Sequence, residues 1–443
     1  MPGLQSKTRP TLSRVRYRVL RMAFFLAIVT YLDRVCIAIA TPFIMQDLGL
    51  TLVQMSTVFG AFTLAYSLFE VPSGWLGDVI GPRRVLTRIV LWWSAFTMLT
   101  GAAQGLRSLV AIRFLFGAGE AGAFPNAVRS FSQWFPARER GLANGVLFLG
   151  SRLGGAITAP IALLLIQRWG WRASFLVFGA VGTIWAVAWY RSYRDRPSED
   201  PDVDPEELAW IQQDRLRETP DGQLPTPKAE PTPWRRLLTS PNLYAICAMY
   251  FTFGYGLYFY FTWLPTYLIK VLGFSLLGGG VFASLPFLLA GIADLVGGWL
   301  TDHLSRRYGL RAGRCHLGFA AFLTCAVLVF SSTLPIPAVA KALLLALALA
   351  SADLALGACW AVPIDIAPDH AGVITGCMNT LGNLGGLVGP IVVGIAVDRW
   401  GSWAFPFYIT AAVYALGALA WLAIDPLAPI RAPAQAIGTR VGS

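Results

Sequence analysis

The sequence predicts an all-α polytopic membrane protein with twelve transmembrane helices in two parallel six-helix repeats. Three observations lead to this fold class: the composition, the spacing of the apolar segments, and short motifs that recur along the chain. Of the 443 residues, 56% are apolar and 13% are charged, whereas soluble domains average about 45–50% and about 25%. So little charge leaves too little polar surface for soluble domains, and the high apolar content excludes intrinsic disorder.

Twelve apolar segments have the length of about 20 residues that a helix needs to cross the hydrocarbon core. They occupy residues 22–44, 54–77, 85–104, 108–131, 141–166, 173–191, 241–268, 279–300, 315–334, 338–365, 371–395 and 402–424. The segment between the sixth and seventh spans is acidic and then proline-rich, which predicts a solvated linker with one short helix near 205–217. The predicted organisation is an N-terminal tail (1–21), a first half (22–191), the linker (192–240), a second half (241–425) and a C-terminal tail (426–443).

The positions of the lysines and arginines explain the net charge of +11. Of the 35 basic residues, 26 lie in the tails, the linker and the connections on the same side, six lie on the opposite side and three lie inside spans. Because cytoplasmic loops carry the excess of Lys and Arg, we expect both termini and the linker in the cytoplasm of an inner-membrane protein. The charge therefore indicates topology, and nucleic-acid binding is not expected. The first span is full-length and lacks an A-x-A cleavage site, so no signal peptide is expected.

Motifs repeat between the two predicted halves at nearly constant offsets. Three motifs recur 231 residues later and one recurs 224 residues later. They are Gly141-x3-Gly145 with Gly372-x3-Gly376, Leu153-Gly154-Gly155 with Leu384-Gly385-Gly386, Arg168-Trp169-Gly170 with Arg399-Trp400-Gly401, and Gly74-Trp75-Leu76-x-Asp78 with Gly298-Trp299-Leu300-x-Asp302. Six spans separate the copies, which is an even number, so the two halves have the same orientation and are related by an axis along the membrane normal.

The connection between spans two and three carries a recognisable loop. Residues 74–84 resemble the G-x-x-x-D-R-x-G-R-R loop of the major facilitator superfamily, with Val79 where the family usually has Arg, and Asp302–Arg307 form a weaker second copy. The resemblance implies that these loops hold the halves closed on the cytoplasmic side. The gating residues that it implies are Asp78, Arg83, Arg84, Asp302 and Arg306. The glycines also suit a tight turn and Asp78 a helix-end charge, so a generic cationic inner loop is the alternative.

Four further segments resemble the anion:cation symporter branch of that superfamily, which includes bacterial sugar-acid permeases and vesicular glutamate and sialic acid carriers. They are residues 31–34, 113–125, 254–268 and 382–386. The resemblance covers nearly the whole chain apart from the linker, and it implies the major facilitator fold. It also implies that the matching acids, Asp33 and Glu120, carry protons and that Ser151 and Trp360 are cavity positions.

Charged residues deep inside the predicted spans of the first half are Asp33, Arg34, Arg113, Glu120 and Arg152. Each costs at least about 2.5–3.5 kcal/mol to insert, so we expect them to face a bundle interior or a wet cavity. Arg113 and Glu120 are seven residues apart, on one helix face and about 10.5 Å apart along the axis, a spacing that brackets a small organic acid. Three arginines make this cavity positive, which predicts an anionic substrate. Carboxyls balanced between desolvation and an arginine suit proton coupling, and a static acid–arginine lock is the alternative.

Other polar residues are expected either to support substrate binding or to make structural contacts. Tyr31, Tyr66, Tyr258 and Asn383 are candidates to hydrogen-bond hydroxyl groups of a sugar acid, with packing or interfacial roles as the alternative. In the second half, Asp294 and Asp353 are expected to make buried polar contacts rather than to take part in coupling. Glu70 is expected to lie against Arg83 or Arg84.

The predicted function is secondary active transport: proton-coupled symport of a small organic anion by alternating access, in a monomer that uses the proton gradient and no cofactor. An exporter or exchanger on the same fold is the alternative, and a transporter-like sensor or a membrane enzyme is the alternative from another class. No Walker motif is present, and Gly117-x-Gly119-x-x-Gly122 lies in an apolar helix without the preceding strand that a nucleotide site needs. The six cysteines form no C-x-x-C pair and the three histidines are far apart, so neither disulfides nor a metal site is expected.

Overall fold

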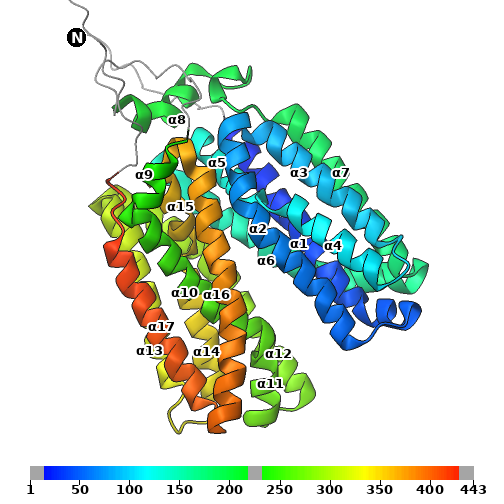
Figure 1. The fold of residues 1–443 in the computed structure, drawn as a ribbon. Coiled ribbons are helices and arrows are strands. Elements are labelled where there is room, and N and C mark those ends of the chain that lie inside the picture. Colours follow the sequence, from blue (N-terminus) through cyan, green and yellow to red (C-terminus); the bar gives the residue numbers. More distant parts are fainter. Residues whose placement is uncertain (1–13, 218–231, 429–443) are drawn as a thin grey trace, which may run out of the picture.

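The computed structural model describes residues 14–217 and 232–428, and in this part of the chain the elements are all helices (Figure 1). The first half contains α1 (Val15–Leu48), α2 (Leu52–Ile80), α3 (Pro82–Thr100), α4 (Leu106–Glu120), α5 (Ala123–Trp134), α6 (Arg140–Trp169) and α7 (Trp171–Ser192). The linker contains α8 (Pro205–Arg217) and α9 (Trp234–Thr239). The second half contains α10 (Pro241–Thr262), α11 (Leu264–Thr266), α12 (Leu276–Tyr308), α13 (Leu317–Ser331), α14 (Ala338–Asp353), α15 (Leu356–Ile366), α16 (Ala371–Trp400) and α17 (Ala404–Ala423).

Each of the twelve predicted spans falls on one helix or on consecutive helices. The fourth span is divided into α4 and α5, and the tenth into α14 and α15. Eight helical stretches within the described residues are long and apolar enough to cross a membrane by length and composition. The predicted linker helix is present as α8, over residues 205–217.

Glycines set the helix ends that matter for the site. α1 ends at Gly49, which has a φ of 65°, because this left-handed conformation is accessible to glycine. Gly122 has a φ of 88° at the break between α4 and α5, and a Cβ there would lie 2.3 Å from the Cβ of Ser73. The break leaves Glu120 as the last residue of α4. The apolar pattern continues through this break, so the sequence indicates one helix where the backbone forms two.

The two halves repeat the same helix pairs. In the first half α1 packs on α6, α2 on α4, and α3 on α7; in the second half α10 packs on α16, α12 on α14, and α13 on α17. Between the halves, α2 contacts α16 and α6 contacts α12. Figure 1 shows the halves side by side, close together at the end that carries α8 and α9 and separated at the opposite end. These two ends are called the linker end and the far end below.

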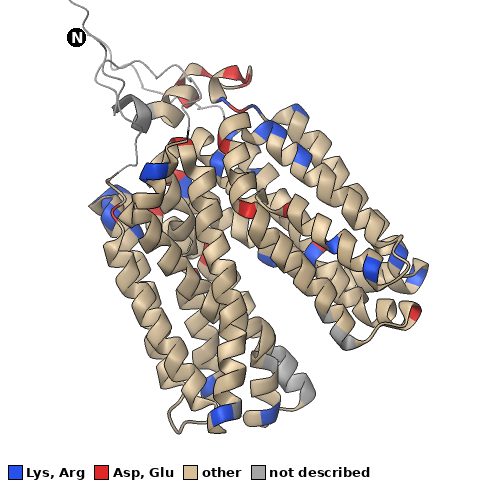
Figure 2. Cartoon of the chain, in the orientation of Figure 1, with Lys and Arg blue, Asp and Glu red and all other residues tan. Residues whose placement is uncertain are grey.

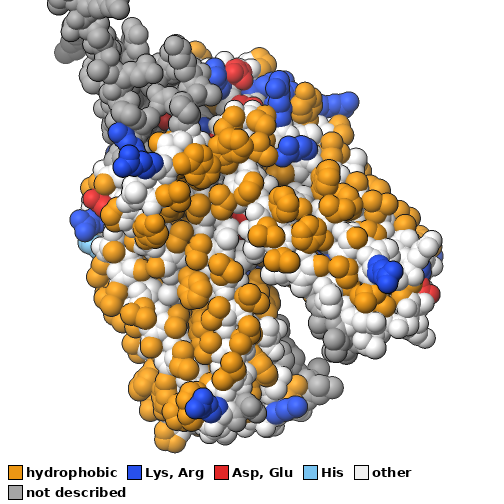
Figure 3. All heavy atoms as spheres, in the orientation of Figure 1, with side chains coloured by type: hydrophobic (Ala, Val, Ile, Leu, Met, Phe, Trp, Pro, Cys, Tyr) orange, Lys and Arg blue, Asp and Glu red, His pale blue; other side chains and the backbone are white. Residues whose placement is uncertain are grey.

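The outer surface is apolar over most of its area. Large side chains such as Leu64, Ile184 and Leu288 are more than half exposed, and hydrophobic side chains cover much of the face in Figure 3. Lys and Arg gather at the ends of the helices, with a few charges at mid-height (Figure 2). An apolar belt between charged ends is what a multi-pass protein presents to lipid.

The linker differs from the solvated segment that its acidic composition predicts. The buried carboxylate of Glu207 accepts hydrogen bonds from the backbone N–H groups of Val15 and Arg16 and pairs with the Arg16 side chain at 3.0 Å. Arg18 pairs with Asp200, which is also buried, and with Asp202 at 2.7 Å. These linker acids therefore stabilise the start of α1. Glu207 accepts the backbone N–H groups of its first turn, where unpaired N–H groups and the helix dipole favour negative charge.

Candidate functional site

Arg34, in the middle of α1, is the most accessible of the three arginines predicted inside the spans. Its side chain is 25% exposed, and its Nε donates to Glu120 Oε1 at 2.7 Å. The guanidinium carbon lies 4.6 Å from the ring centre of Tyr66, 5.4 Å from Phe62 and 5.8 Å from Tyr31. Its Nη2 has no hydrogen-bond partner. Aromatic faces stabilise the cation and limit its motion, and Nη2 is a buried donor without a hydrogen bond.

Asp33 and Arg113 lie deeper than Arg34. Asp33 is 1% exposed, neither of its carboxylate oxygens has a hydrogen-bond partner, and its electrostatic neighbours are Glu120 and Arg113. Arg113 is 2% exposed, its guanidinium lies 4.1 Å from the ring centre of Phe116, and its Nε is unpaired. A buried carboxylate without hydrogen bonds is costly in its charged form. Besides Arg113 and Glu120, the polar side chains of Thr97 and Trp93 also face Asp33.

The structure brings four of the predicted site charges together. Arg34 and Glu120 are paired, and Arg113 interacts electrostatically with both Glu120 and Asp33. Two acids and two arginines give a net charge of zero when all are ionised. Arg34 is partly exposed and the other three are buried, so Arg34 is the most accessible of the four charges.

Arg152 does not belong to this group of charges. It was expected as a third anion anchor, but its Nη2 donates to Asp353 Oδ2 at 2.9 Å and its Nε lies 3.5 Å from Asp294 Oδ2. The expectation that these two acids make buried polar contacts agrees with these pairs. Arg152 lies on α6 of the first half and both acids lie on the second half, so the contact crosses between the halves.

The other predicted polar positions meet on the opposite side of the interface. Tyr258 Oη donates to Asn383 Oδ1 at 3.5 Å, and Asn383 Nδ2 donates to Glu70 Oε2 at 3.3 Å. Asn379 Nδ2 donates to the other oxygen of Glu70. The expectation that Glu70 contacts Arg83 or Arg84 is therefore wrong: Glu70 is fully buried and points to α16, because α2 crosses α16 there.

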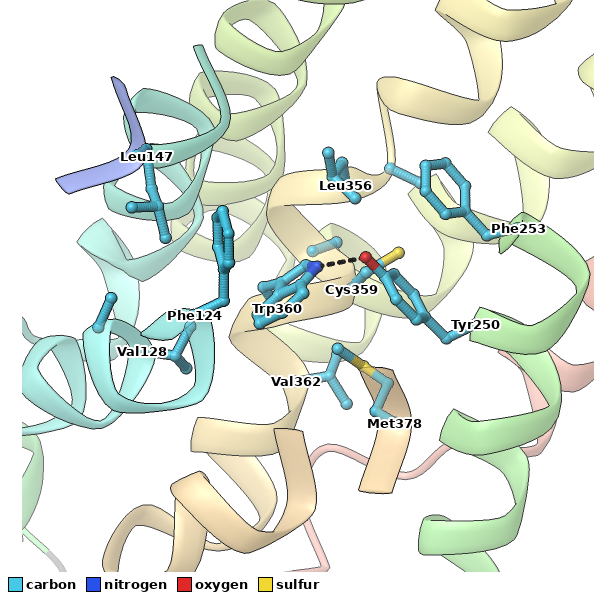
Figure 4. Packing of buried hydrophobic residues seen from close by; sticks show 14 of the residues in the cluster. Phe124, Val128, Leu147, Tyr250, Phe253, Leu356, Cys359, Trp360, Val362 and Met378 are labelled. Carbon is cyan, nitrogen blue, oxygen red and sulfur yellow. Dashed lines mark hydrogen bonds between the residues drawn. The ribbon is translucent and has the colours of Figure 1, made fainter. Parts of the chain in front are cut away.

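Trp360 lies inside the closed part of the interface. Its Nε1 donates to Tyr250 Oη at 2.9 Å, and its ring packs on Phe124 and Phe148 of the first half with centroid distances of 5.9 and 5.1 Å (Figure 4). Ser151 is also buried, and its hydroxyl has no hydrogen-bond partner. In this conformation both residues lie beneath the space between the halves rather than on its wall.

Two aspartates close the linker end. Asp78 of α2 accepts the N–H groups of Gly372 at 3.0 Å and Val373 at 2.8 Å, at the start of α16. Asp302 of α12 accepts those of Gly141 at 3.0 Å and Leu142 at 2.7 Å, near the start of α6. Each aspartate therefore satisfies the first turn of a helix in the opposite half, where the helix dipole favours a negative charge.

The cationic partners of these aspartates differ from the predicted ones. Arg129 Nε lies 3.2 Å from Asp78, and Arg314 Nη1 donates to Asp302 at 2.9 Å. Arg83 instead donates to the backbone carbonyl of Tyr190 and, through its N–H, to Asp195. Arg84 and Arg306 are exposed, with no ion pair among the described residues.

Sequence reasoning missed Arg129, Arg314 and Asn379 as interface residues. The two arginines were counted among the basic residues that indicate topology, and charge counting cannot separate a solvated arginine from a buried one. Asn379 lies four residues before Asn383, on the same face of α16, and this spacing is the signal that would have found it. Phe62 carries no polar atom, so its place beside Arg34 depends on the packing of α1 on α2.

Comparison with known proteins agrees with this geometry. The model of the Major Facilitator Superfamily matches residues 23–390. A probable sulfoacetate transporter of Cupriavidus necator is 36% identical over 96% of this chain and 97% of its own length, and a D-galactonate transporter of Escherichia coli is 30% identical over 92% and 95%. Among solved structures, the proton:xylose symporter XylE has a TM-score of 0.70 with 14% identity, covering 92% of this chain and 95% of its own, which bears on the fold alone.

The family model spans most of the chain, including both six-helix repeats up to the middle of α16. The repeated helix pairs, the interface between the two halves and the relatives all indicate the same family of transporters. The chain belongs to the Major Facilitator Superfamily, and it is a multi-pass membrane transporter rather than an enzyme.

Proposed function

We propose that this protein is a proton-coupled symporter of a small organic anion. The observation that carries the proposal is the charge-balanced group of Asp33, Arg34, Arg113 and Glu120, in which Arg34 is accessible and Asp33 has no hydrogen bond. The named substrates of the relatives, sulfoacetate and D-galactonate, are small organic anions, and this supports the same class here.

The coupling follows from competition for Arg34. Glu120 occupies Arg34 Nε in the absence of an anion, and a carboxylate or sulfonate that binds the guanidinium takes over this contact. One added negative charge then leaves the group with a net charge of −1 in a low-dielectric space, which a proton on Glu120 or Asp33 offsets. The anion and the proton thus stabilise each other, which is the thermodynamic requirement for symport.

The same proposal includes the orientation and the conformational cycle. With 26 of the 35 basic residues on the side of the tails and the linker, the linker end faces the cytoplasm and the far end faces outward. The halves are separated at the far end (Figure 3) and joined at the linker end by Asp78 and Asp302. This state receives an anion from outside, and rocking of the halves about the site releases it inside.

A transport assay tests the proposal. Purified protein is reconstituted in liposomes that contain a pH-sensitive dye, and sulfoacetate, glucuronate or D-galactonate is added outside. We expect at least one of these anions to acidify the lumen, and both Asp33→Asn and Glu120→Gln to abolish acidification. Because neither substitution removes Arg34, both variants should retain exchange of labelled anion across the membrane.

The alternatives give different results in this assay. Anion exchange without acidification in the wild type would favour an exchanger. Acidification that persists in both variants would exclude Asp33 and Glu120 as the coupling groups. Uptake that requires a sodium gradient and moves no proton would replace proton coupling with sodium coupling.

A further inference from the structure

The contact made by Arg152 has a counterpart on the other side of the molecule, and the repeat offsets identify it. Adding 224 to Glu70 gives Asp294, and adding 231 to Arg152 gives Asn383. Glu70 contacts Asn383 where α2 meets α16, and Asp294 contacts Arg152 where α12 meets α6. The inner contacts of the two interfaces are therefore equivalent positions that carry different chemistry: an acid with amides on one side, and an arginine with acids on the other.

The charged contact contains more negative than positive charge. Asp294 and Asp353 are both 0% exposed, and Arg152 is the one cation that pairs with them among the described residues. Neither oxygen of Asp294 has a hydrogen bond, and Oδ1 of Asp353 has none. Two ionised acids against one guanidinium leave an uncompensated buried charge, which is strongly unfavourable.

The surroundings supply no second cation. The other titratable groups that face the cluster from the helices packed around it are neutral at ordinary pH, and they are Tyr31 on α1, Tyr260 on α10, Cys325 on α13, Cys359 on α15 and Tyr414 on α17. A proton is the smallest ligand that can balance the cluster, and Oδ1 of Asp294 and Oδ1 of Asp353 have neither a hydrogen bond nor an ion pair with Arg152.

We propose that Asp294 and Asp353 form a second proton-binding site, which controls an ionic contact between the two halves through Arg152. Ionised acids hold Arg152 and keep the linker end closed. The first proton balances the cluster and leaves one ionised acid on Arg152, whereas a second proton removes this last partner and favours separation of the halves at the linker end. By linkage, separation also favours proton uptake, because it leaves the two acids without their cation.

This inference rests on the proposed alternating-access function but uses different residues. Asp33 and Glu120 couple the proton to the anion within the first half, whereas Asp294 and Asp353 couple a proton to the relative position of the halves. One proton taken up on opening changes the ratio of the two conformations by up to about tenfold per pH unit.

A distance measurement without substrate tests the inference. Spin labels are attached to cysteines introduced at Gln104 and Leu334, which lie at the far end of the first and second halves and are exposed. The native cysteines are buried or half-buried, and protein without the introduced cysteines measures background labelling. The measurement is made between pH 8 and pH 5 in an Asp33→Asn/Glu120→Gln background, so that the proposed coupling acids do not contribute.

We expect the population with the long far-end distance to decrease as the pH falls in this background. Adding Asp294→Asn and Asp353→Asn should remove this dependence and favour the short distance at every pH. Arg152→Gln should also remove it, whereas Arg152→Lys, which keeps the charge, should retain it. If the double substitution prevents folding, the comparison of Arg152→Gln with Arg152→Lys applies the test without changing either acid.

Two results would overturn the inference. The pH dependence could be absent before Asp294 and Asp353 are changed, which would make the cluster a static contact. It could also persist unchanged after both are replaced, which would assign it to another group such as Glu70. Neither result depends on proton-driven anion uptake, so the failure of this inference and that of the proposed function are distinguishable.

Discussion

At the scale of single residues, the difference between the three membrane arginines is their access to the space between the halves. Arg34 is 25% exposed and has aromatic rings around it, Arg113 is buried beside Asp33, and Arg152 is held by two acids. The residue type and depth in the span are similar in all three. What differs is the acid that each guanidinium contacts and how much of the side chain stays exposed.

Replacing Arg34 with Lys tests its role as the anchor. Lysine keeps the charge but loses the planar pair of donors and most of the stacking on Tyr66. We expect the apparent affinity for the transported anion to fall by roughly 10- to 100-fold, which corresponds to about 1.4–2.8 kcal/mol. Competition of unlabelled sulfoacetate or D-galactonate with labelled anion in proteoliposomes measures it.

Arg107→Lys is the matched control for that substitution. Arg107 is exposed near the start of α4 at the far end, so the same chemical change should leave the affinity unaltered. Unchanged affinity in Arg34→Lys, with a large loss in Arg113→Lys, would instead assign the anchor to Arg113.

At the scale of helices, closure of the linker end depends on glycines where α2 meets α16. A Cβ on Gly74 would lie 2.2 Å from the carbonyl oxygen of Gly372, so the two helices touch through their backbones. The close approach places Asp78 within hydrogen-bond distance of the first turn of α16. The backbone contact at Gly74 and the hydrogen bonds of Asp78 therefore both hold α2 against α16.

Gly74→Ala should favour the conformation that is open at the linker end. The added methyl group forces α2 and α16 apart, and overpacking of this kind costs about 1–3 kcal/mol. We expect at least a roughly tenfold change in the ratio of conformations, seen as a shorter distance between labels at Gln104 and Leu334. Gly60→Ala is the control. Gly60 is on the same helix, and no atom lies within 4 Å of a Cβ added there. This variant therefore has the same change in helix propensity without the new contact, and it should leave the distance between the labels unchanged. Equal effects of the two variants would show that propensity, rather than contact, is responsible.

At the scale of the whole molecule, two equivalent interfaces connect the halves, and both are closed at the linker end. Asp78 and Asp302 occupy the outer positions of these interfaces, while Glu70 and Asp294 occupy the inner ones. The outer contacts are alike, whereas the inner ones carry a charge difference. The proposed second proton site thus lies at the one of these two interfaces whose inner contact contains an arginine.

The proposed orientation predicts which surfaces reagents reach in intact cells. A cysteine at Gln104, at the far end, should react with a membrane-impermeant maleimide added outside. A cysteine in place of Tyr308, which is 62% exposed at the linker end, should react only after the membrane is permeabilised. The reverse pattern would contradict cytoplasmic placement of the linker. Protein with only its native cysteines, which are buried or half-buried, is the control.

Much of the helical framework could be predicted because hydrophobic length and repeated motifs are local properties of a chain. The twelve spans, the linker helix over 205–217 and the superfamily follow from patterns that need no knowledge of neighbours. The partners of charged side chains could not be predicted in the same way. Glu70 was assigned to Arg83 or Arg84 by proximity in sequence, yet it contacts α16 more than 300 residues later.

The sequence by itself determined that the chain spans a membrane, that its halves repeat, and that buried charges in the first half suit an anion. Only the tertiary structure decided which of those charges share a space. Arg34 of α1 and Glu120 of α4 are brought together by the packing of the first half, while Arg152 is held by Asp294 and Asp353. The physical reason is that hydrophobic burial can be read from residue types along one helix, whereas an ion pair depends on distances between helices that are fixed only when the bundle packs.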